Sequence, residues 1–279
     1  MIKKILVCLE GSSSADSATR LALDAARACG ARLVGLAIID EPDIRAGAAM
    51  GIGGSTFKHE RDEALVADAR KHAEDWITLF ERRCRDAGVP GNGLEVVGRP
   101  VDSILEEMDG FDLTVMGRDA NFRFETERED LQTRDTILHK ATRPVLLVPE
   151  MTAPALGSAV LIAYDGSTAA KRALTSFAAS GLAVGRTIHV GTADDNGARA
   201  WEMANLGVQM LAAANIVATG HNIVSVQSPA DSLFSLAVEL RAGLMIMGAF
   251  AHSRLRHLFS GSATHGLVEK SPIPLYLQH

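Results

Sequence analysis

An acidic side chain and two glycine turns in the second half of the chain have the residue types of a nucleotide site. Asp165 follows an apolar run that ends at Tyr164. Gly248 ends another apolar run, and Gly261 and Ser262 follow it after a loop. A carboxylate at a strand end accepts hydrogen bonds from sugar hydroxyls, and backbone N–H groups at a glycine turn bind phosphate oxygens. These residues predict a site for a ribose beside a phosphate, as in an adenine nucleotide.

Composition and charge restrict the class of protein. The chain has 279 residues, of which 47% are hydrophobic and 22% charged, and its formal net charge is −6. This composition is typical of a globular protein with one or two domains. Neither half contains the basic cluster that nucleic-acid or membrane-surface binding requires. No apolar stretch approaches the roughly 20 residues of a membrane span. We therefore expect no nucleic-acid partner and no membrane.

The N-terminus and the cysteines indicate a cytoplasmic protein. Met1 and two lysines lead directly into an apolar run, without the long apolar region of a signal peptide. Cys8, Cys29 and Cys84 form an odd, scattered set without metal-binding spacing. Reduced thiols in the cytoplasm are the expectation for such a set.

The same pattern of residues occurs twice. Four pairs of segments are similar and occur in the same order: 5–13 with 160–168, 100–105 with 229–234, 112–117 with 243–248, and 143–148 with 273–278. Such a series indicates a duplication. We predict two domains, residues 1–149 and 158–279, joined by a linker that contains Pro154 and Gly157.

Short apolar runs alternate with helical patterns in each half. The expected strands are 2–9, 32–39, 93–98, 112–117 and 144–148 in the first half, and 159–164, 186–191, 222–227, 243–248 and 274–278 in the second. Helical spacing is clear over 14–29 and 64–84. Nearly continuous apolar strands alternating with helices predict an α/β fold, with a parallel, doubly wound sheet of five strands in each half.

The first half is the longer one, and most of its excess falls near residues 42–62, which are rich in glycine and alanine. Such a segment is too flexible to be predicted as a regular element. A mobile surface loop, a lid over a neighbouring site and a packing arm are all consistent with it.

The strand-end acidic residue, the Met-Gly turn and the proline before the last strand resemble the universal stress protein family in its tandem, two-domain form. The family loop G-x2-G-x9-G-[ST] is matched by Gly248, Gly261 and Ser262, with Ala251 in place of the second glycine. The resemblance covers nearly the whole chain. It implies two five-stranded α/β sandwich domains of the adenine-nucleotide alpha-hydrolase-like kind, which bind ATP or AMP, with or without Mg²⁺. It also implies a stress-response role in the cytoplasm without a well-defined catalytic activity.

The resemblance further implies that the two domains pair through their last strands. The run 145–148 is too apolar to form an open sheet edge. We therefore predict an intramolecular pseudo-dimer through the strands near 144–148 and 274–278. A homodimer of the whole chain is left open.

By the same resemblance, eight residues of the second half form the nucleotide site. Asp165 would meet the ribose, and Val190, at the end of the second strand, would offer backbone groups to the adenine edge. Gly248 would let the sugar and phosphates approach the backbone. The phosphates would lie against a loop and a helix N-terminus that contain Ala251, Arg254, Gly261, Ser262 and Ala263. The structural alternative is that these turns are simple helix caps and that Arg254 is a solvated loop residue.

Ala251 is the departure from the family loop. If its position requires a left-handed backbone, alanine costs about 1–2 kcal/mol there. We expect weak nucleotide binding, with AMP or ADP tolerated about as well as ATP.

The first half is a poor candidate for a second site. Glu10 replaces the short carboxylate, and Leu131 and Gln132 stand at the positions of the glycine and serine. The run 125–130 between them is acidic and would repel phosphates. We therefore predict one nucleotide per chain, although Arg118 and neighbouring arginines leave an altered ligand open.

Three functions compete. The leading one is a nucleotide-binding stress protein that acts through an unidentified protein partner and not through robust catalysis. A slow ATPase or adenylyl-transfer enzyme is the second, although no general base and no Walker A loop are identifiable. The third is a nucleotide-free scaffold whose segment 42–62 captures a hydrophobic ligand or a partner. A metal site at His252, His257 and His265 is disfavoured, because their spacing matches no compact zinc motif.

Overall fold

The computed structural model describes residues 1–46, 55–120, 122, 133–150, 156–224, 228–249, 268 and 271–279. The first half, residues 1–149, contains β1 (Lys4–Leu9), α1 (Ser13–Cys29), β2 (Arg32–Ile39), α2 (Glu41–Ala46), α3 (Ser55–Ala87), β3 (Gly91–Val97), α4 (Pro100–Met108), β4 (Leu113–Gly117), α5 (Thr133–Lys140) and β5 (Val145–Val148). The second half, residues 158–279, contains β6 (Ala159–Ala163), α6 (Thr168–Ser180), β7 (Thr187–Asp194), α7 (Gly197–Ala213), β8 (Ala218–Val224), α8 (Pro229–Glu239), β9 (Ala242–Gly248) and β10 (Leu275–Gln278).

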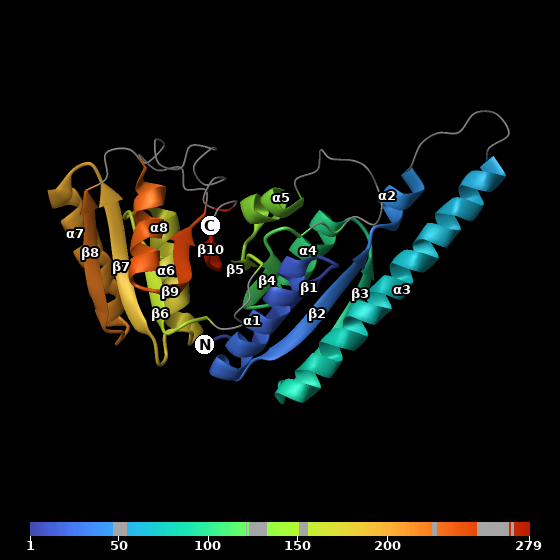
Figure 1. Cartoon of the computed structure of the whole chain (residues 1–279), viewed down its shortest axis with the longest axis horizontal. Helices are drawn as coiled ribbons and strands as arrows, with labels where there is room; N and C mark the ends of the chain where they lie inside the picture. The colour runs from blue at the N-terminus through green and yellow to red at the C-terminus, as the bar shows by residue number, and fades with distance from the viewer. Residues whose placement is uncertain are drawn as a thin grey trace.

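All ten strands form one continuous sheet in the order β3-β2-β1-β4-β5-β10-β9-β6-β7-β8 (Figure 1). Within each half every pairing is parallel. The halves join through β5 and β10, which pair antiparallel with Tyr276 opposite Leu146. The predicted fold class and the predicted pairing of the last strands are both confirmed.

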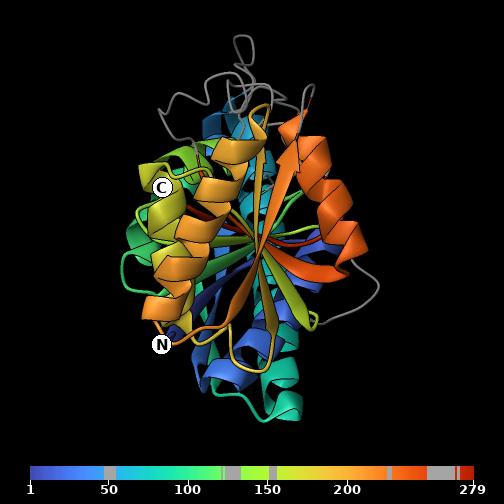
Figure 2. The same ribbon diagram turned by 90° about the vertical axis from the view of Figure 1, so that its left-hand side faces the viewer.

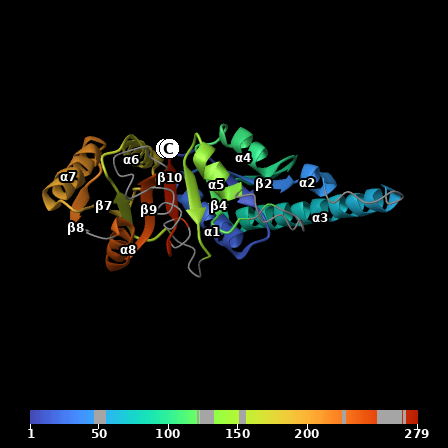
Figure 3. The same ribbon diagram turned by 90° about the horizontal axis from the view of Figure 1, so that it is seen from above.

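Helices cover both faces of this sheet, so the central strands are buried on both sides (Figure 3). One core layer contains side chains from α1, α3, α6 and α7, such as Leu21 and Phe177. The other contains side chains from α4, α5 and α8, such as Ile104 and Leu233. Seen end-on, the strands fan out as expected for a twisted parallel sheet (Figure 2).

The helices that follow the first strand of each half begin in the same way. The side chain of Ser12 accepts a hydrogen bond from the backbone N–H of Ala15, and that of Ser167 accepts one from Ala170. Serine at this position satisfies an N–H that has no partner within the helix. Gly30, with φ of 64°, ends α1 in the left-handed conformation that glycine adopts without strain. The duplicated sequence therefore produces duplicated helix starts.

The prediction of an irregular segment over 42–62 is wrong for its described parts. Residues 41–46 form α2, and α3 starts at Ser55 instead of near 64. Ion pairs stabilise this region: Arg45 pairs with Glu41 and Glu63, at 2.6 and 2.9 Å. Residues 47–54 lie outside the described part of the chain. The first turns of α3 lack a strong apolar stripe, and for that reason periodicity did not detect them.

The long helix α3 runs along the outer strands of the first half and extends past them (Figures 1 and 3). Its 33 residues correspond to a length of about 50 Å at the usual rise per residue. Among the described residues, no helix has both the length and the apolar character needed to span a bilayer.

Candidate functional site

A hollow opens at the carboxyl ends of β6, β7 and β9 in the second half. In a parallel sheet this is the edge where loops and helix N-termini meet a ligand. Its lining is mostly apolar, with a few polar groups: Ala163, Tyr164, Asp165, Ser167, Ala170, Gly191, Ala193, Pro229, Leu233, Met247 and Gly248. Such a lining is typical of a small-molecule site.

Asp165 is held at the rim of this hollow by the start of α6. Its Oδ1 accepts a hydrogen bond from the backbone N–H of Ser167 at 2.8 Å, and Ser167 in turn caps the helix. Between them Gly166 has a φ of 77°, and a Cβ there would lie 2.8 Å from Met203 Sδ. Only glycine fits this turn without strain. The carboxylate is therefore anchored through one oxygen and stays half-exposed.

Val190 does not lie at the end of its strand, contrary to the prediction. β7 continues to Asp194, and Val190 is fully buried in mid-strand opposite Ile162. The residues that line the hollow are Gly191 and Ala193, farther along the strand. The prediction stopped β7 too early because the apolar run is interrupted by glycine and threonine.

Gly248 lies in the hollow as predicted, at the end of β9. A Cβ at this position would lie 2.5 Å from the backbone nitrogen of Ala170. Close packing of the strand against the start of α6 thus accounts for the glycine. Five further predicted site residues lie outside the described part of the chain: Ala251, Arg254, Gly261, Ser262 and Ala263.

The corresponding position of the first half is filled. The repeat aligns Cys8 of β1 with Ala163 of β6. Cys8 pairs with Leu36 of β2, whereas Ala163 pairs with Gly191 of β7. Leu36 therefore takes the place of Gly191, and its side chain is completely buried.

A second large side chain occupies the same region of the first half. Ile38, two residues after Leu36, takes the place of Ala193. It is buried in one apolar cluster with Ile104 of α4 and Phe122. Larger apolar side chains therefore fill the space that is hollow in the second half.

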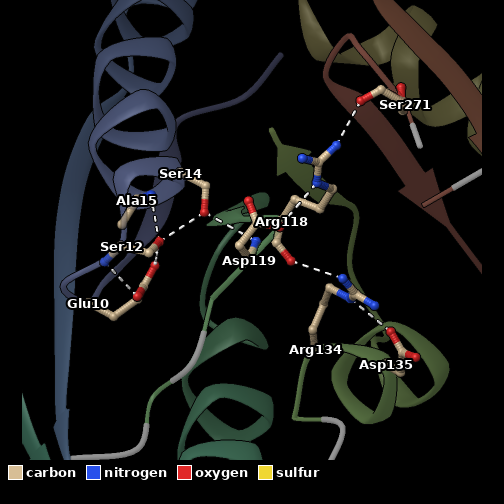
Figure 4. Close-up of polar contacts among 9 residues, drawn as sticks. All are labelled: Glu10, Ser12, Ser14, Ala15, Arg118, Asp119, Arg134, Asp135 and Ser271. Carbon is tan, nitrogen blue, oxygen red and sulfur yellow. Dashed lines mark hydrogen bonds and ion pairs between the residues drawn. The ribbon is translucent and has the colours of Figure 1, made fainter. Parts of the chain in front are cut away.

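Glu10, the counterpart of Asp165, uses both carboxylate oxygens within its own turn (Figure 4). Oε2 accepts from the backbone N–H of Ser12, and Oε1 accepts from the Ser12 hydroxyl. Ser12 also contacts Ser14, whose hydroxyl accepts a hydrogen bond from the backbone N–H of Asp119. Glu10 is only 7% exposed. This carboxylate is thus part of a closed network that ties β1 to the end of β4.

The same network continues into the other half (Figure 4). Arg118 directs its guanidinium to the backbone carbonyl oxygen of Ser271, at 3.0 Å, just before β10. Arg134 of α5 donates to the carbonyl oxygen of Arg118, also at 3.0 Å, and pairs with Asp135. The carboxyl edge of the first half therefore contacts the second half through Arg118.

A separate hollow lies farther out at this edge, beside α2, α4 and α5. Three carboxylates line it, those of Asp40, Asp43 and Asp102, together with Arg99. Such a charge balance opposes phosphate binding.

Titratable groups next to the two strand ends provide no activated nucleophile. Burial raises the pKa of the Cys8 thiol to about 12, so it stays protonated at neutral pH. Burial, and then the charge of Asp165, raise the pKa of Tyr164. All three cysteines are buried and unbridged. Among the described residues, no three or more histidine, cysteine or acidic side chains are grouped to hold a metal ion.

Comparisons with known proteins agree with the duplicated fold. The model of the universal stress protein family matches residues 1–149 and again 158–278. Universal stress protein Slr1230 of Synechocystis sp. is 23% identical in sequence. The match covers 98% of this chain and 99% of the relative.

Two solved structures span almost the whole chain. A universal stress protein from Archaeoglobus fulgidus, 18% identical, covers 99% of this chain and 95% of its own, with a TM-score of 0.74. A functionally unknown protein from Pseudomonas aeruginosa is 14% identical. It covers 99% of this chain and 92% of its own, with a TM-score of 0.55. With both halves matched by the family model, the chain belongs to the universal stress protein family.

Proposed function

We propose that the second half binds one adenine nucleotide, ATP, ADP or AMP, in the hollow beside Asp165, and that the first half binds none. The observation that carries this proposal is the difference between the two strand ends. Gly191 and Ala193 leave a space in one half that Leu36 and Ile38 fill in the other.

The lining of the hollow suits the parts of a nucleoside. The adenine ring would lie in the apolar part, against Ala193, Leu233 and Met247. The ribose hydroxyls would donate to Asp165, whose Oδ1 is already oriented by the Ser167 N–H. A charge-assisted hydrogen bond of this kind is stronger than one between neutral groups.

The phosphates would extend toward Gly261 and Ser262, which match the family loop in sequence. A helix N-terminus there would offer N–H groups to the phosphate oxygens. Ala251 remains the departure from the family pattern, so we expect weak binding that discriminates little between AMP and ATP.

A binding role is favoured over catalysis. Asp165 is the one carboxylate among the described residues that line the hollow, and its oriented oxygen is already engaged. General acid–base chemistry requires a group with a matched pKa within reach of the reacting atoms. We therefore propose a cytoplasmic stress-response protein in which nucleotide occupancy changes a surface that a protein partner recognises.

The nature of the ligand can be tested by mass spectrometry of small molecules released on denaturing the purified protein. We expect an adenine nucleotide from the native chain and much less from Asp165→Ala. Protein that is first incubated with AMP and then desalted covers the case in which a weak ligand is lost during purification. A hydrophobic ligand, or no nucleotide under either condition, would favour the scaffold alternative.

A further inference from the structure

Two histidines face each other at the outer edge of the second half. His189 lies on β7, and His221 lies on β8, the last strand of the sheet. Their ring nitrogens Nδ1 and Nε2 are 2.9 Å apart, and the ring centroids are 5.0 Å apart. Both side chains are partly exposed. The two rings thus direct one nitrogen atom each toward the other, at a partly exposed position.

The first half has no such pair at the equivalent positions. Strand pairing places Val34 where the second half has His189, because Leu6 and Leu161 are equivalent in the repeat. In the same way Leu94 takes the place of His221. The first half thus folds with two aliphatic side chains at these positions. Folding of the second half therefore does not require the two imidazoles.

The imidazoles are suited to act as neutral ligands. The hydrogen bond between the two ring nitrogens requires that one of them carries no proton and so presents a lone pair. Neutral imidazole nitrogen is the form that binds Zn²⁺, Ni²⁺ or Cu²⁺. A carboxylate-rich site would instead favour Mg²⁺ or Ca²⁺.

We propose that His189 Nδ1 and His221 Nε2 together bind one divalent transition-metal ion of the Zn²⁺ class, with water molecules completing its coordination. The site is independent of the proposed nucleotide site.

The required movement is small. Nitrogen ligands lie about 2.0–2.1 Å from zinc, so two ligands of a tetrahedral ion are about 3.3 Å apart. The rings must therefore separate by a few tenths of an ångström, and each must turn by about 35° so that its lone pair leaves the N···N line and points at the ion. Rotation of the two partly exposed side chains supplies this change. The hydrogen that the two nitrogens share moves through solvent to the outer nitrogen of the ring that carried it. Both lone pairs then point at the metal, and neither imidazole changes its charge.

Binding would connect the last two strands. Among the described strands β8 pairs with β7 alone, so it stands at one end of the sheet. A metal ion held by one ligand from each strand links them and stabilises the folded protein in proportion to occupancy. Because only two protein ligands are available, we expect weaker binding than at structural zinc sites with four.

Calorimetric titration of the nucleotide-free full-length chain with Zn²⁺ tests the proposal. We expect one site in the native protein and, because a direct ligand is lost, at least about tenfold weaker binding in His221→Asn. The double variant His189→Val with His221→Leu carries the residues of the first half, which fit this position of the fold. His72→Gln, which removes an exposed histidine of α3, is the matched control and should bind Zn²⁺ as the native chain does.

A second readout separates metal ligation from a purely structural role. With Cu²⁺ as the probe, electron paramagnetic resonance should report two equivalent histidine nitrogens in the native chain and not in the double variant. Zn²⁺ binding that is equally strong in the double variant would overturn the proposal, as would no binding to the native chain at millimolar Zn²⁺. Neither result would affect the proposed nucleotide site.

Discussion

The carboxyl edges of the two halves share a framework and differ in what fills it. Each has an acidic residue after its first strand, a serine-capped helix and a glycine that packs against that helix. In the second half, Gly191 and Ala193 leave a hollow, and in the first, Leu36 and Ile38 close it. Two positions on one strand thus distinguish the two linings, although the first half has hollows elsewhere at this edge, beside Glu10 and Trp76 and beside α2, α4 and α5.

The acidic residues differ in the same sense. Asp165 is anchored through a single oxygen, whereas both oxygens of Glu10 are bound by Ser12. Beyond Glu10, Arg118 contacts the second half at Ser271. The comparison teaches that two copies of one backbone can carry a hollow in one copy and a contact between the halves in the other.

Exchanging the side chain that fills the pocket should have the largest effect. Ala193→Ile gives the second half the residue of the first, and we expect nucleotide affinity to fall about a hundredfold or below detection, because the isoleucine occupies the ring position. Ile38→Ala is the matched control and should leave affinity unchanged. Titration with AMP measures both. Unchanged affinity in Ala193→Ile would break the comparison.

The glycines that the halves share should matter for folding in both. Gly248→Ala places a methyl group 2.5 Å from Ala170 N, and Gly117→Ala places one 2.9 Å from Ala15 N. Overpacking of this kind costs about 1–3 kcal/mol of the free energy of unfolding. Urea denaturation should show a loss in both variants, larger for Gly248. A loss in only one half would show that the two helix starts are not equivalent.

Removal of the acidic residues should separate the halves by function. Asp165→Ala should weaken nucleotide binding by about 1–2 kcal/mol, roughly tenfold, through the loss of a charge-assisted hydrogen bond. Glu10→Ala should leave affinity unchanged, although it breaks the network around Ser12. Competition with a fluorescent nucleotide analogue measures the nucleotide affinity of each variant. Equal weakening by both changes would mean that the site is misplaced.

The contact between the halves should make a smaller contribution to stability. Arg118→Ala removes the donor to the Ser271 carbonyl oxygen, and we expect a loss of about 1 kcal/mol, since water reaches part of the arginine. Arg27→Ala, which removes an exposed contact within the first half, should cost less. Chemical denaturation of both variants measures the two losses in the free energy of unfolding. The reverse ranking would contradict an interface role for Arg118.

The histidine pair should add a small pH dependence that the first half lacks. The pKa of His189 is lowered in the folded protein, so the unfolded chain binds a proton more readily. The resulting stability is fully present above the ordinary histidine value of about 6.5 and is lost as the pH falls from there toward the lowered folded pKa. Urea midpoints between neutral and mildly acid pH should decline less in the double variant with His189→Val and His221→Leu. An identical decline in the native chain and the double variant would show that the histidine pair does not cause the pH dependence.

The central strands could be predicted because they are buried on both faces. β1, β4 and β9 read as continuous apolar runs, and their end positions carry the acidic and glycine residues of the repeat. β8 was predicted at 222–227, but it starts at Ala218. It is an edge strand whose residues are half-exposed, so its apolar signal is weak.

The pocket itself could not be predicted from composition or periodicity. It depends on strand register, which decides that Gly191 and not Val190 lies at the hollow. A residue-by-residue alignment of the second strands of the two halves would have placed Gly191 opposite Leu36 in the repeat. That difference in side-chain volume was visible in the sequence, but only pairing with β6 gives it a spatial meaning.

The number of nucleotides bound per chain tests the central claim most directly. Nucleotide-free protein titrated calorimetrically with AMP should give a stoichiometry near one, with binding abolished by Ala193→Ile and retained in Ile38→Ala. A stoichiometry near two, or binding that survives Ala193→Ile, would contradict the assignment of the nucleotide to the second half alone.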